Sequence, residues 1–330
     1  MTIDIHCHYV PPQFFALMQR EPAFAVRLGR QEGEDVDVSV GGLRYGLNRT
    51  FFDADRQVAR MAALGIDRTV VSLATPFVGY GADAGLGIAA ASLFNDEIAV
   101  LVRADPDRFA GWAFLPMQAP DAAAAELRRA VTTLGLSGGH IASNVNGRYL
   151  HSPEYAPIFE AACDLDVPLF VHPANPPGRE RMADYELAVV SGYLFDSTLN
   201  VFHMIFGGLL DRHPRLRMVI THAGGYALML RARMQREVDT NPALAATIAR
   251  PVGDYLKQLW FDSICFEPGY MRYVTEAVGA DRFLLGSDGP FPLGEPDPVG
   301  FVRRSLGAGP ATEGVLERNV AALFGPRWSV

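Results

Sequence analysis

The sequence predicts an α/β protein whose 330 residues form a (β/α)8 TIM barrel with an insertion between strands 1 and 2. Short runs rich in Val, Ile, Leu and Phe alternate with longer helical patterns along the whole chain. This alternation is typical of parallel strands covered by helices on both faces. Eight such units favour a closed barrel over an open doubly wound sheet. No repeat or low-complexity tract interrupts the pattern, and residues 1–330 are predicted to form one domain.

The predicted strands are short and mostly apolar. In chain order they are Ile3–His8, Thr69–Ala74, Phe109–Leu115, Ser137–Ala142, Pro168–His172, Arg217–His222, Trp260–Cys265 and Phe283–Ser287. The helical patterns between them are clearest at Asp55–Leu64, Gly87–Arg103, Ala119–Thr133, Ser152–Leu165 and Gly225–Glu237.

One connection is much longer than the others. Residues Gln13 to Arg49 separate the first two predicted strands and include the pair Gly41-Gly42. Loops at the mouth of a barrel usually carry specificity, so we expect an insertion over the mouth that contains a small hairpin.

Composition excludes several classes of protein. Hydrophobic residues make up 49% of the chain and charged residues 20%, which suits a large core and disfavours disorder. A net charge of −8 argues against a nucleic-acid partner. No segment approaches the ~20 consecutive apolar residues that span a bilayer, and the first residues lack the pattern of a signal peptide. Three widely spaced cysteines suggest no disulfide framework. We therefore expect a soluble, cytoplasmic protein with no membrane partner.

Two histidines end the first predicted strand. Alternate side chains of a strand share a face, so His6 and His8 point the same way while Cys7 points to the other face. Two adjacent imidazoles suit half of a metal site, although this pair alone fits chance or a satisfied core pair equally well.

The ends of later strands carry similar residues. His172 ends the fifth strand, His222 the sixth, and Asp288 follows the eighth. Barrel enzymes build their sites from the carboxyl ends of strands, so these side chains should converge with those of the first strand. The sequence therefore predicts a metal site at that end of the barrel.

This order of residues resembles the amidohydrolase superfamily, and within it the branch of the aminocarboxymuconate-semialdehyde and gamma-resorcylate decarboxylases. The resemblance covers nearly the whole chain, and its last segment is the most specific. The segments that carry it are Ile5-His6-Cys7-His8, Leu169-Phe170-Val171-His172-Pro173, Thr221-His222-Ala223-Gly224-Gly225 and Leu285-Gly286-Ser287-Asp288-Gly289-Pro290-Phe291-Pro292-Leu293-Gly294-Glu295.

The resemblance implies one divalent metal with a bound water. Its ligands would be His6, His8, His172 and Asp288. His222 would lie beside the water and, with Asp288, form the catalytic pair. Three nitrogens and one oxygen suit Zn²⁺, and Mn²⁺ is the alternative because it occurs in relatives. Lys257, the only lysine, follows His222 and so cannot serve as the bridging lysine of a binuclear centre.

Four residues are candidates for substrate binding. A carboxylate-binding arginine would favour decarboxylation, and both Arg44 and Arg49 lie near the place where the family's decarboxylases have one. Arg233 matches a family arginine that reaches a neighbouring subunit's site, which implies a homodimer. Tyr185 matches an aromatic near the substrate of the muconate decarboxylase. Solvated arginines and loop packing of the tyrosine are the alternatives.

Several residues depart from the family pattern, among them Ala174-Asn175 after His172, where the muconate decarboxylase has Trp-Asp. Gly289 stands where the muconate decarboxylase has Tyr, and we expect this change to open the pocket. His140, on the fourth strand, has no counterpart; contact with substrate is one interpretation, and a buried, hydrogen-bonded core residue is the favoured one.

The sequence thus predicts a metal-dependent decarboxylase of a small aromatic or unsaturated carboxylic acid. A metal on a neighbouring oxygen and an acid at His222 would stabilise and protonate the carbon that loses carbon dioxide. The same pair would also activate water, so a hydrolase of a lactone, ester or carbon–carbon bond is the alternative. A catalytically silent barrel is a third interpretation, which the complete set of ligands disfavours.

Overall fold

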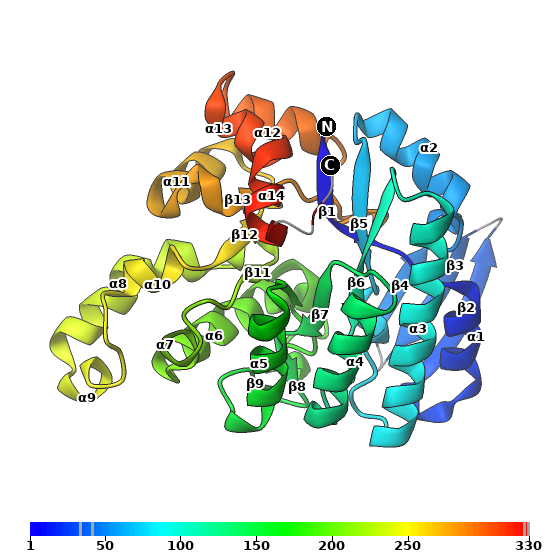
Figure 1. Ribbon diagram of the computed structural model, residues 1–330, viewed down its shortest axis with the longest axis horizontal. Coiled ribbons are helices and arrows are strands. Elements are labelled where there is room, and N and C mark those ends of the chain that lie inside the picture. Colours follow the sequence, from blue (N-terminus) through cyan, green and yellow to red (C-terminus); the bar gives the residue numbers. More distant parts are fainter. Residues whose placement is uncertain (33–34, 41–42, 326–327, 329–330) are drawn as a thin grey trace.

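The predicted barrel is confirmed by a computed structural model, which describes residues 1–32, 35–40, 43–325 and 328. Parallel strands lie in the order β1-β5-β6-β7-β10-β11-β12-β13, with helices around them (Figure 1). Backbone contacts join the last strand to the first: the Ile5 N–H donates to Leu285 O at 2.9 Å, and Cys7 bridges Gly289. The barrel strands are β1 Ile3–His8, β5 Arg68–Ser72, β6 Phe109–Phe114, β7 Gly138–Ala142, β10 Leu169–His172, β11 Met218–Ile220, β12 Trp260–Asp262 and β13 Phe283–Leu284.

Five predicted strands end earlier than expected, and β11, β12 and β13 are the three that lead to the predicted site or lie beside it. The ladder stops at Ile220, Asp262 and Leu284, whereas the sequence predicted strands to His222, Cys265 and Ser287. The chain turns sharply beyond the ladder, and His222 and Asp288 have the positive φ angles 55° and 56°. Positive φ is uncommon outside glycine, so these site residues sit in tight turns rather than in the strands themselves.

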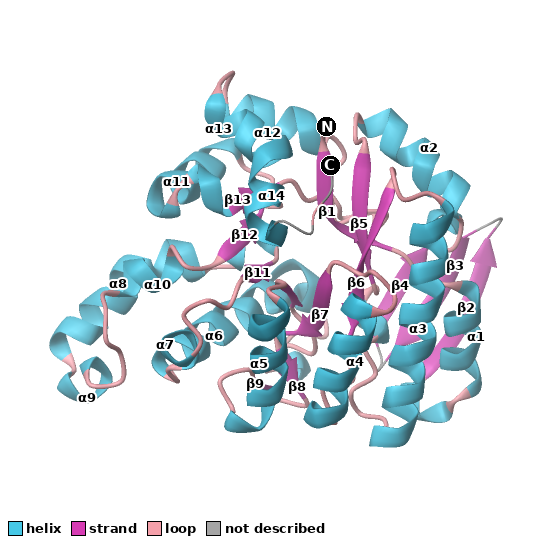
Figure 2. Ribbon diagram, viewed as in Figure 1, coloured by secondary structure: helices cyan, strands magenta, loops and turns pink. Residues whose placement is uncertain are grey.

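Helices cover the outside of the barrel (Figure 2). Side-chain caps begin several of them: Asp53 accepts from Arg56 N, and Asp83 accepts from Leu86 N at 3.0 Å. The helices are α1 Pro12–Arg20, α2 Ala54–Leu64, α3 Ala84–Ala104, α4 Pro120–Thr132, α5 Ala156–Leu165, α6 Tyr193–Phe206, α7 Leu209–Arg212, α8 Ala227–Thr240, α9 Pro242–Ala245, α10 Val252–Leu256, α11 Pro268–Val278, α12 Pro298–Leu306, α13 Pro310–Glu313 and α14 Asn319–Phe324.

Helix α3 is long and apolar enough, by length and composition, to cross a membrane. It packs on the outside of the barrel against β6, and the buried Asn95 side chain donates from the helix to Phe114 O at 3.0 Å. Packing against the barrel therefore explains the apolar side chains of α3.

The long first connection contains more structure than the expected hairpin. After α1 it forms a three-stranded antiparallel sheet of β2 Val26–Glu32, β3 Asp35–Val40 and β4 Leu43–Leu47. The hydroxyls of Tyr45 on β4 and Tyr193 on α6 lie 2.8 Å apart, which ties this sheet to the barrel's outer layer. The pair Gly41-Gly42 lies outside the described residues.

Aromatic side chains fill the barrel beneath the predicted site. Trp112 is fully buried, with its ring centroid 5.2 Å from that of Phe170 and 5.1 Å from that of Phe324. Its indole N–H donates to Ile5 O at 2.9 Å, so it joins β6 to β1 across the barrel.

Truncating Trp112 should therefore be costly. We expect Trp112→Ala to lower the free energy of unfolding by about 3–5 kcal/mol, because it leaves a cavity and an unpaired carbonyl. Urea unfolding measures this, and Trp112→Phe is the control that keeps most of the volume. Equal stability of the alanine variant and the wild type would contradict this account of the core.

Candidate metal centre

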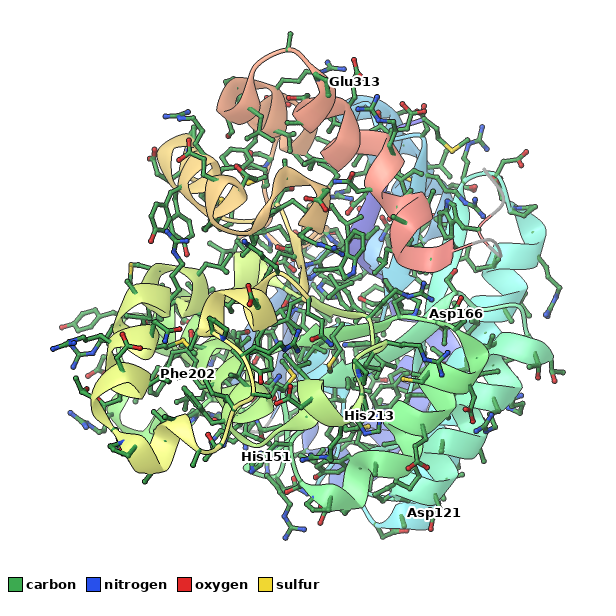
Figure 3. All side chains as sticks on the ribbon, turned by 60° about the vertical axis from the view of Figure 1, so that its left-hand side comes forward. Asp121, His151, Asp166, Phe202, His213 and Glu313 are labelled. Carbon is green, nitrogen blue, oxygen red and sulfur yellow. The ribbon has the colours of Figure 1, made fainter. Side chains whose placement is uncertain are left out.

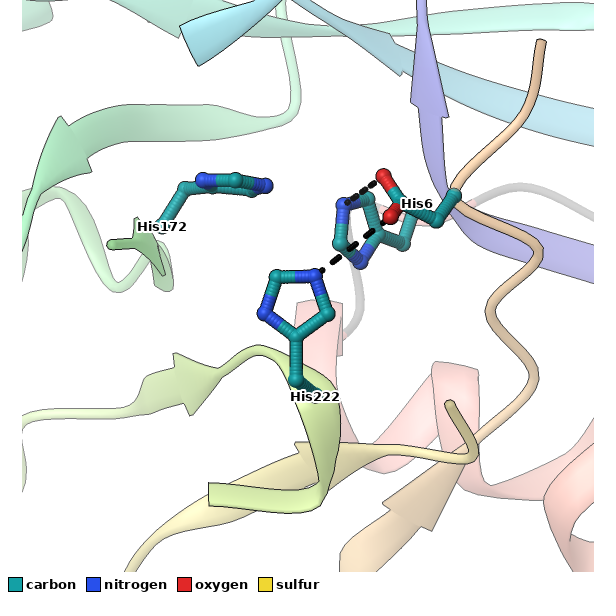
Figure 4. Close-up of side chains that lie close together, drawn as sticks. His6, His172 and His222 are labelled. Atoms are coloured by element: carbon teal, nitrogen blue, oxygen red, sulfur yellow. Dashed lines mark ion pairs between the residues drawn. The ribbon is translucent and has the colours of Figure 1, made fainter. Parts of the chain in front are cut away.

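Five polar side chains from distant parts of the chain meet at the carboxyl end of the barrel. His6 and His8 come from β1, His172 ends β10, and His222 and Asp288 follow β11 and β13. Figure 4 shows His6, His172 and His222 with their rings close together. Ligand atoms of His6, His172, His222 and Asp288 all lie within 4.8 Å of one another. The structure thus brings together three of the four predicted metal ligands, and His222 with them.

His8 joins the same group through its Nε2 atom. This atom lies 3.0 Å from Asp288 Oδ1 and 3.2 Å from Nε2 of His6. The Nε2 atom of His6 is in turn 3.3 Å from Asp288 Oδ1, so the two β1 imidazoles share one carboxylate oxygen.

The other ring nitrogen of each imidazole already has an acceptor. Nδ1 of His6 lies 2.7 Å from Asp262 Oδ2, and Nδ1 of His8 lies 3.2 Å from Leu73 O. Nδ1 of His172 lies 2.9 Å from Pro173 O. Ser72 Oγ and Thr75 Oγ1 also lie 3.1 Å and 2.5 Å from Nδ1 of His8 and His172, and a hydroxyl oxygen can accept. Carbonyl and carboxylate oxygens only accept, so we assign the proton to Nδ1 in each ring. Each Nε2 then presents a lone pair to the centre of the group.

These donors fit a cation. The lone pairs of His6 and His8 face each other beside a carboxylate, and Nε2 of His172 is buried without a hydrogen-bond partner among the described residues. Imidazole nitrogens and a carboxylate oxygen are the ligands that Zn²⁺ and other divalent transition metals prefer. The chemistry of this donor set therefore suits one divalent metal.

The electrostatics of the group demand positive charge. Burial alone would raise the pKa of the Asp288 carboxyl, but the neighbouring His6 charge and three histidine hydrogen bonds hold it well below its usual value. Burial alone would lower the pKa of His6, yet the Asp288 charge and the bond to Asp262 raise it to about 10. A proton on His6 and a metal ion thus satisfy the same need, so protons compete with metal for this site.

His222 differs from the other members of the group. It is partly exposed, whereas the others are buried, and its Nε2 lies 3.5 Å from the second oxygen of Asp288. Its Nδ1 has no hydrogen-bond partner among the described residues. An imidazole placed at the open side of a metal group can exchange a proton with a bound molecule.

Asp262 was missed by the sequence analysis. It is fully buried at the end of β12 and accepts from His6 Nδ1 and, at 2.9 Å, from the backbone N–H of His222. Its other oxygen accepts from Ala223 N at 2.9 Å. One carboxylate therefore orients His6 and also fixes the turn that carries His222. The only signal in the sequence was an acidic residue inside the predicted apolar strand Trp260–Cys265.

The predicted substrate residues lie apart from this group. Arg44, Arg49 and Arg233 are solvent-exposed, and Tyr185 is 88% exposed. Arg44 alternates along β4 with Tyr45, which points inward. Arg233 lies on α8, which projects away from the barrel (Figure 1). Among the described residues, no hydrogen bond or ion pair joins any of these four side chains to the metal group.

The expectation for Gly289 does not agree with the geometry. A Cβ atom there would lie 1.7 Å from the Arg60 guanidinium, which donates to Ser287 Oγ at 2.8 Å. Arg60 belongs to the outer helix α2, so the missing side chain makes room for this arginine and not for a pocket.

The expectation for His140 is half right. It is fully buried on β7, but neither ring nitrogen has a hydrogen-bond partner among the described residues. Its ring centroid lies 5.5 Å from that of Phe170 and 6.4 Å from that of His172, beneath the metal group. Other histidines lie farther out: His151 and His213 are among the outer helices in Figure 3, and His151 stacks on His203.

Comparisons with known proteins agree with this geometry. The amidohydrolase family model matches residues 3–325. A Dictyostelium discoideum 2-amino-3-carboxymuconate-6-semialdehyde decarboxylase is 31% identical over 299 residues, covering 89% of this chain and 83% of the relative. A Rhodococcus jostii gamma-resorcylate decarboxylase is 32% identical over 256 residues, covering 72% and 77%.

Solved structures share the fold. The Metarhizium anisopliae IDCase has a TM-score of 0.88 at 23% identity, covering 98% of this chain and 97% of that one. A dihydroxybenzoic acid decarboxylase from a Polaromonas species, solved with bound manganese and an inhibitor, has a TM-score of 0.79 at 24% identity, covering 98% and 96%.

The chain belongs to the amidohydrolase family. Within it, this protein is an enzyme of the branch whose curated relatives are decarboxylases.

Asp262 should control metal binding without touching the metal. We expect Asp262→Asn to weaken metal affinity about 10–100-fold, because the amide is a weaker acceptor for His6 Nδ1. Metal content after dialysis and competition with a chelator measure this. Asp281→Asn, at an exposed surface carboxylate, is the control. Wild-type affinity in Asp262→Asn would show that this contact does not support the site.

Proposed function

We propose that this enzyme is a metal-dependent decarboxylase of a small aromatic or unsaturated carboxylic acid. The observation that carries the proposal is a group of four imidazoles and one carboxylate at the carboxyl end of the barrel, in which His222 alone is partly exposed. The names of the curated relatives support the reaction, and several of those relatives act on hydroxylated aromatic acids.

The proposed ligands are His6, His8, His172 and Asp288, the residues whose free donor atoms converge. Three nitrogens and one oxygen suit Zn²⁺, while manganese in two of the solved relatives makes Mn²⁺ the second candidate. A bound divalent ion would supply positive charge that polarises a substrate oxygen.

His222 is the proposed proton donor. Loss of carbon dioxide breaks one carbon–carbon bond and leaves its electron pair on the carbon that held the carboxylate. That carbon must take up a proton, and His222 lies on the partly exposed side of the group, with its Nε2 3.5 Å from Asp288 Oδ2 and its turn held by Asp262. Placing this donor beside the reacting carbon is what general acid catalysis requires.

Carboxylate binding is assigned to exposed arginines of an assembled dimer. Arg44 or Arg49 would serve one site, and Arg233 on the projecting α8 would reach the site of a second subunit. Exposed apolar side chains support an interface beside the loop of Tyr185, including Leu187, Val190 and Phe195. All three cysteines are free, which supports a reducing cytoplasm as the location.

The reaction can be tested directly with metal-replete enzyme. We expect loss of carbon dioxide from at least one acid in a panel of hydroxybenzoic and muconate-type acids, followed by mass spectrometry. A chelator should abolish it, and Zn²⁺ or Mn²⁺ should restore it. Hydrolysis of a lactone, with no acid in the panel decarboxylated, would instead identify the enzyme as a hydrolase that uses the same residues.

Metal binding and proton transfer should separate by mutation. Asp288→Ala is expected to lose most bound metal, because it removes the carboxylate shared by His6 and His8. His222→Ala should keep its metal and lower kcat by about 10²–10⁴-fold, because only the proton donor is gone. Elemental analysis and steady-state kinetics measure the two effects. Full metal occupancy in Asp288→Ala would show that the ligand assignment is wrong.

A further inference from the structure

A buried carboxylate outside the metal group has no place in the reaction described so far. Asp196 lies on α6 and is fully buried. Its partners are four N–H or O–H donors: the Ser143 hydroxyl, the Asn144 amide (3.1 Å), the Tyr149 hydroxyl (3.0 Å) and the Ala174 backbone N–H (3.3 Å). A full set of donors is what an ionised carboxylate requires. Burial raises the pKa of Asp196 to about 6, while the hydrogen bonds from its four donors act in the opposite direction.

These donors belong to the segments that surround His172. Ser143 follows β7, and its backbone N–H donates to His172 O at 2.9 Å. The Ser143 hydroxyl oxygen also accepts from Ala174 N at 3.2 Å, so it stands between that amide and Asp196. The Asn144 amide holds the other side of the same residue, donating to Ala174 O at 2.5 Å.

The connection to the metal group is a single peptide bond. The N–H of Ala174 and the C=O of Pro173 belong to one planar, conjugated unit. That C=O accepts from Nδ1 of His172 at 2.9 Å. An anion at the N–H end polarises the unit and makes its oxygen a better acceptor, as in any chain of hydrogen bonds. Thr75 Oγ1, 2.5 Å from the same Nδ1, adds a second restraint on the ring.

We infer that Asp196 is a positioning residue for the metal ligand His172, acting through the Pro173–Ala174 peptide. Its charge fixes the orientation of the ring and strengthens Nε2 as a donor, as Asp262 does for His6 by direct contact. The inference rests on the metal site proposed above and assigns a role to a residue that touches neither metal nor substrate.

Binding of Co²⁺ tests this without any turnover. The probe is Co²⁺ alone, titrated into metal-free enzyme with a competing chelator, and its visible absorption spectrum reports the ligand geometry. We expect Asp196→Asn to bind Co²⁺ about 10–100-fold more weakly, with an altered spectrum, because the neutral amide polarises the peptide less.

Glu126 provides a matched control. It is also a buried helix carboxylate, but it bonds to Asn95 and Arg129 on the outside of the barrel. Glu126→Gln removes a buried charge at a similar structural cost, and we expect it to bind Co²⁺ like the wild type. Thermal unfolding of both variants separates lost stability from lost affinity.

Wild-type affinity and spectrum in Asp196→Asn would overturn the inference and leave Asp196 as a loop anchor. Equal losses in Asp196→Asn and Glu126→Gln would also overturn it, because general destabilisation would then explain both. If Asp196→Asn does not fold, Ser143→Ala decides the question, since it weakens the same link and should lower affinity by a smaller factor. A wild type that binds no Co²⁺, Zn²⁺ or Mn²⁺ would instead remove the metal site on which the proposed function stands.

Discussion

Repulsion between lone pairs at one end of the barrel is the constraint on which the site depends. Nε2 atoms of His6 and His8 lie 3.2 Å apart, and both face the same oxygen of Asp288. In a buried setting such groups are stable together only when positive charge lies among them. Parallel strands supply the means to hold them there, because all their carboxyl ends open on one face of the barrel. The fold therefore brings these groups together, and their closeness in turn requires positive charge among them.

The three imidazoles are held in three chemically different ways. His6 donates to the Asp262 carboxylate, and His8 donates to the Leu73 carbonyl. His172 donates to the Pro173 carbonyl, and the N–H of the same peptide unit donates to the Asp196 carboxylate. An anionic acceptor strengthens the opposite nitrogen more than a neutral one does. The three proposed ligands are thus unequal donors, and their donor strengths differ with the acceptors bonded to their Nδ1 atoms. The groups behind the three rings come from β12, from the chain after β5 and from α6. None of these elements contributes one of the three imidazoles.

Sequence patterns predicted the barrel and the metal group because both depend on local rules. Period-two alternation places His6 and His8 on one face, and strand ends locate His172 and Asp288 at one end of the barrel. The contacts of Asp262 and Asp196 depend on pairs distant in sequence: 256 residues separate His6 from Asp262, and 53 separate Ser143 from Asp196. No local pattern specifies such pairs. Arg44, Arg49, Arg233 and Tyr185 were predicted from matching family positions alone, and all four are exposed.

The glycine beside Asp288 links the site to the outside of the molecule. A side chain at Gly289 would press on Arg60, whose guanidinium is fixed by Ser287, and Ser287 Oγ in turn donates to the buried Asp4 at 2.5 Å. Helix α2 thereby stabilises, through Arg60, the turn that bears Asp288. A substitution at position 289 intended to broaden the range of accepted substrates would therefore displace Arg60 and would not open space at the metal group. Conversely, a substitution on the outer face of α2 that shifts Arg60 would also shift the turn that bears Asp288.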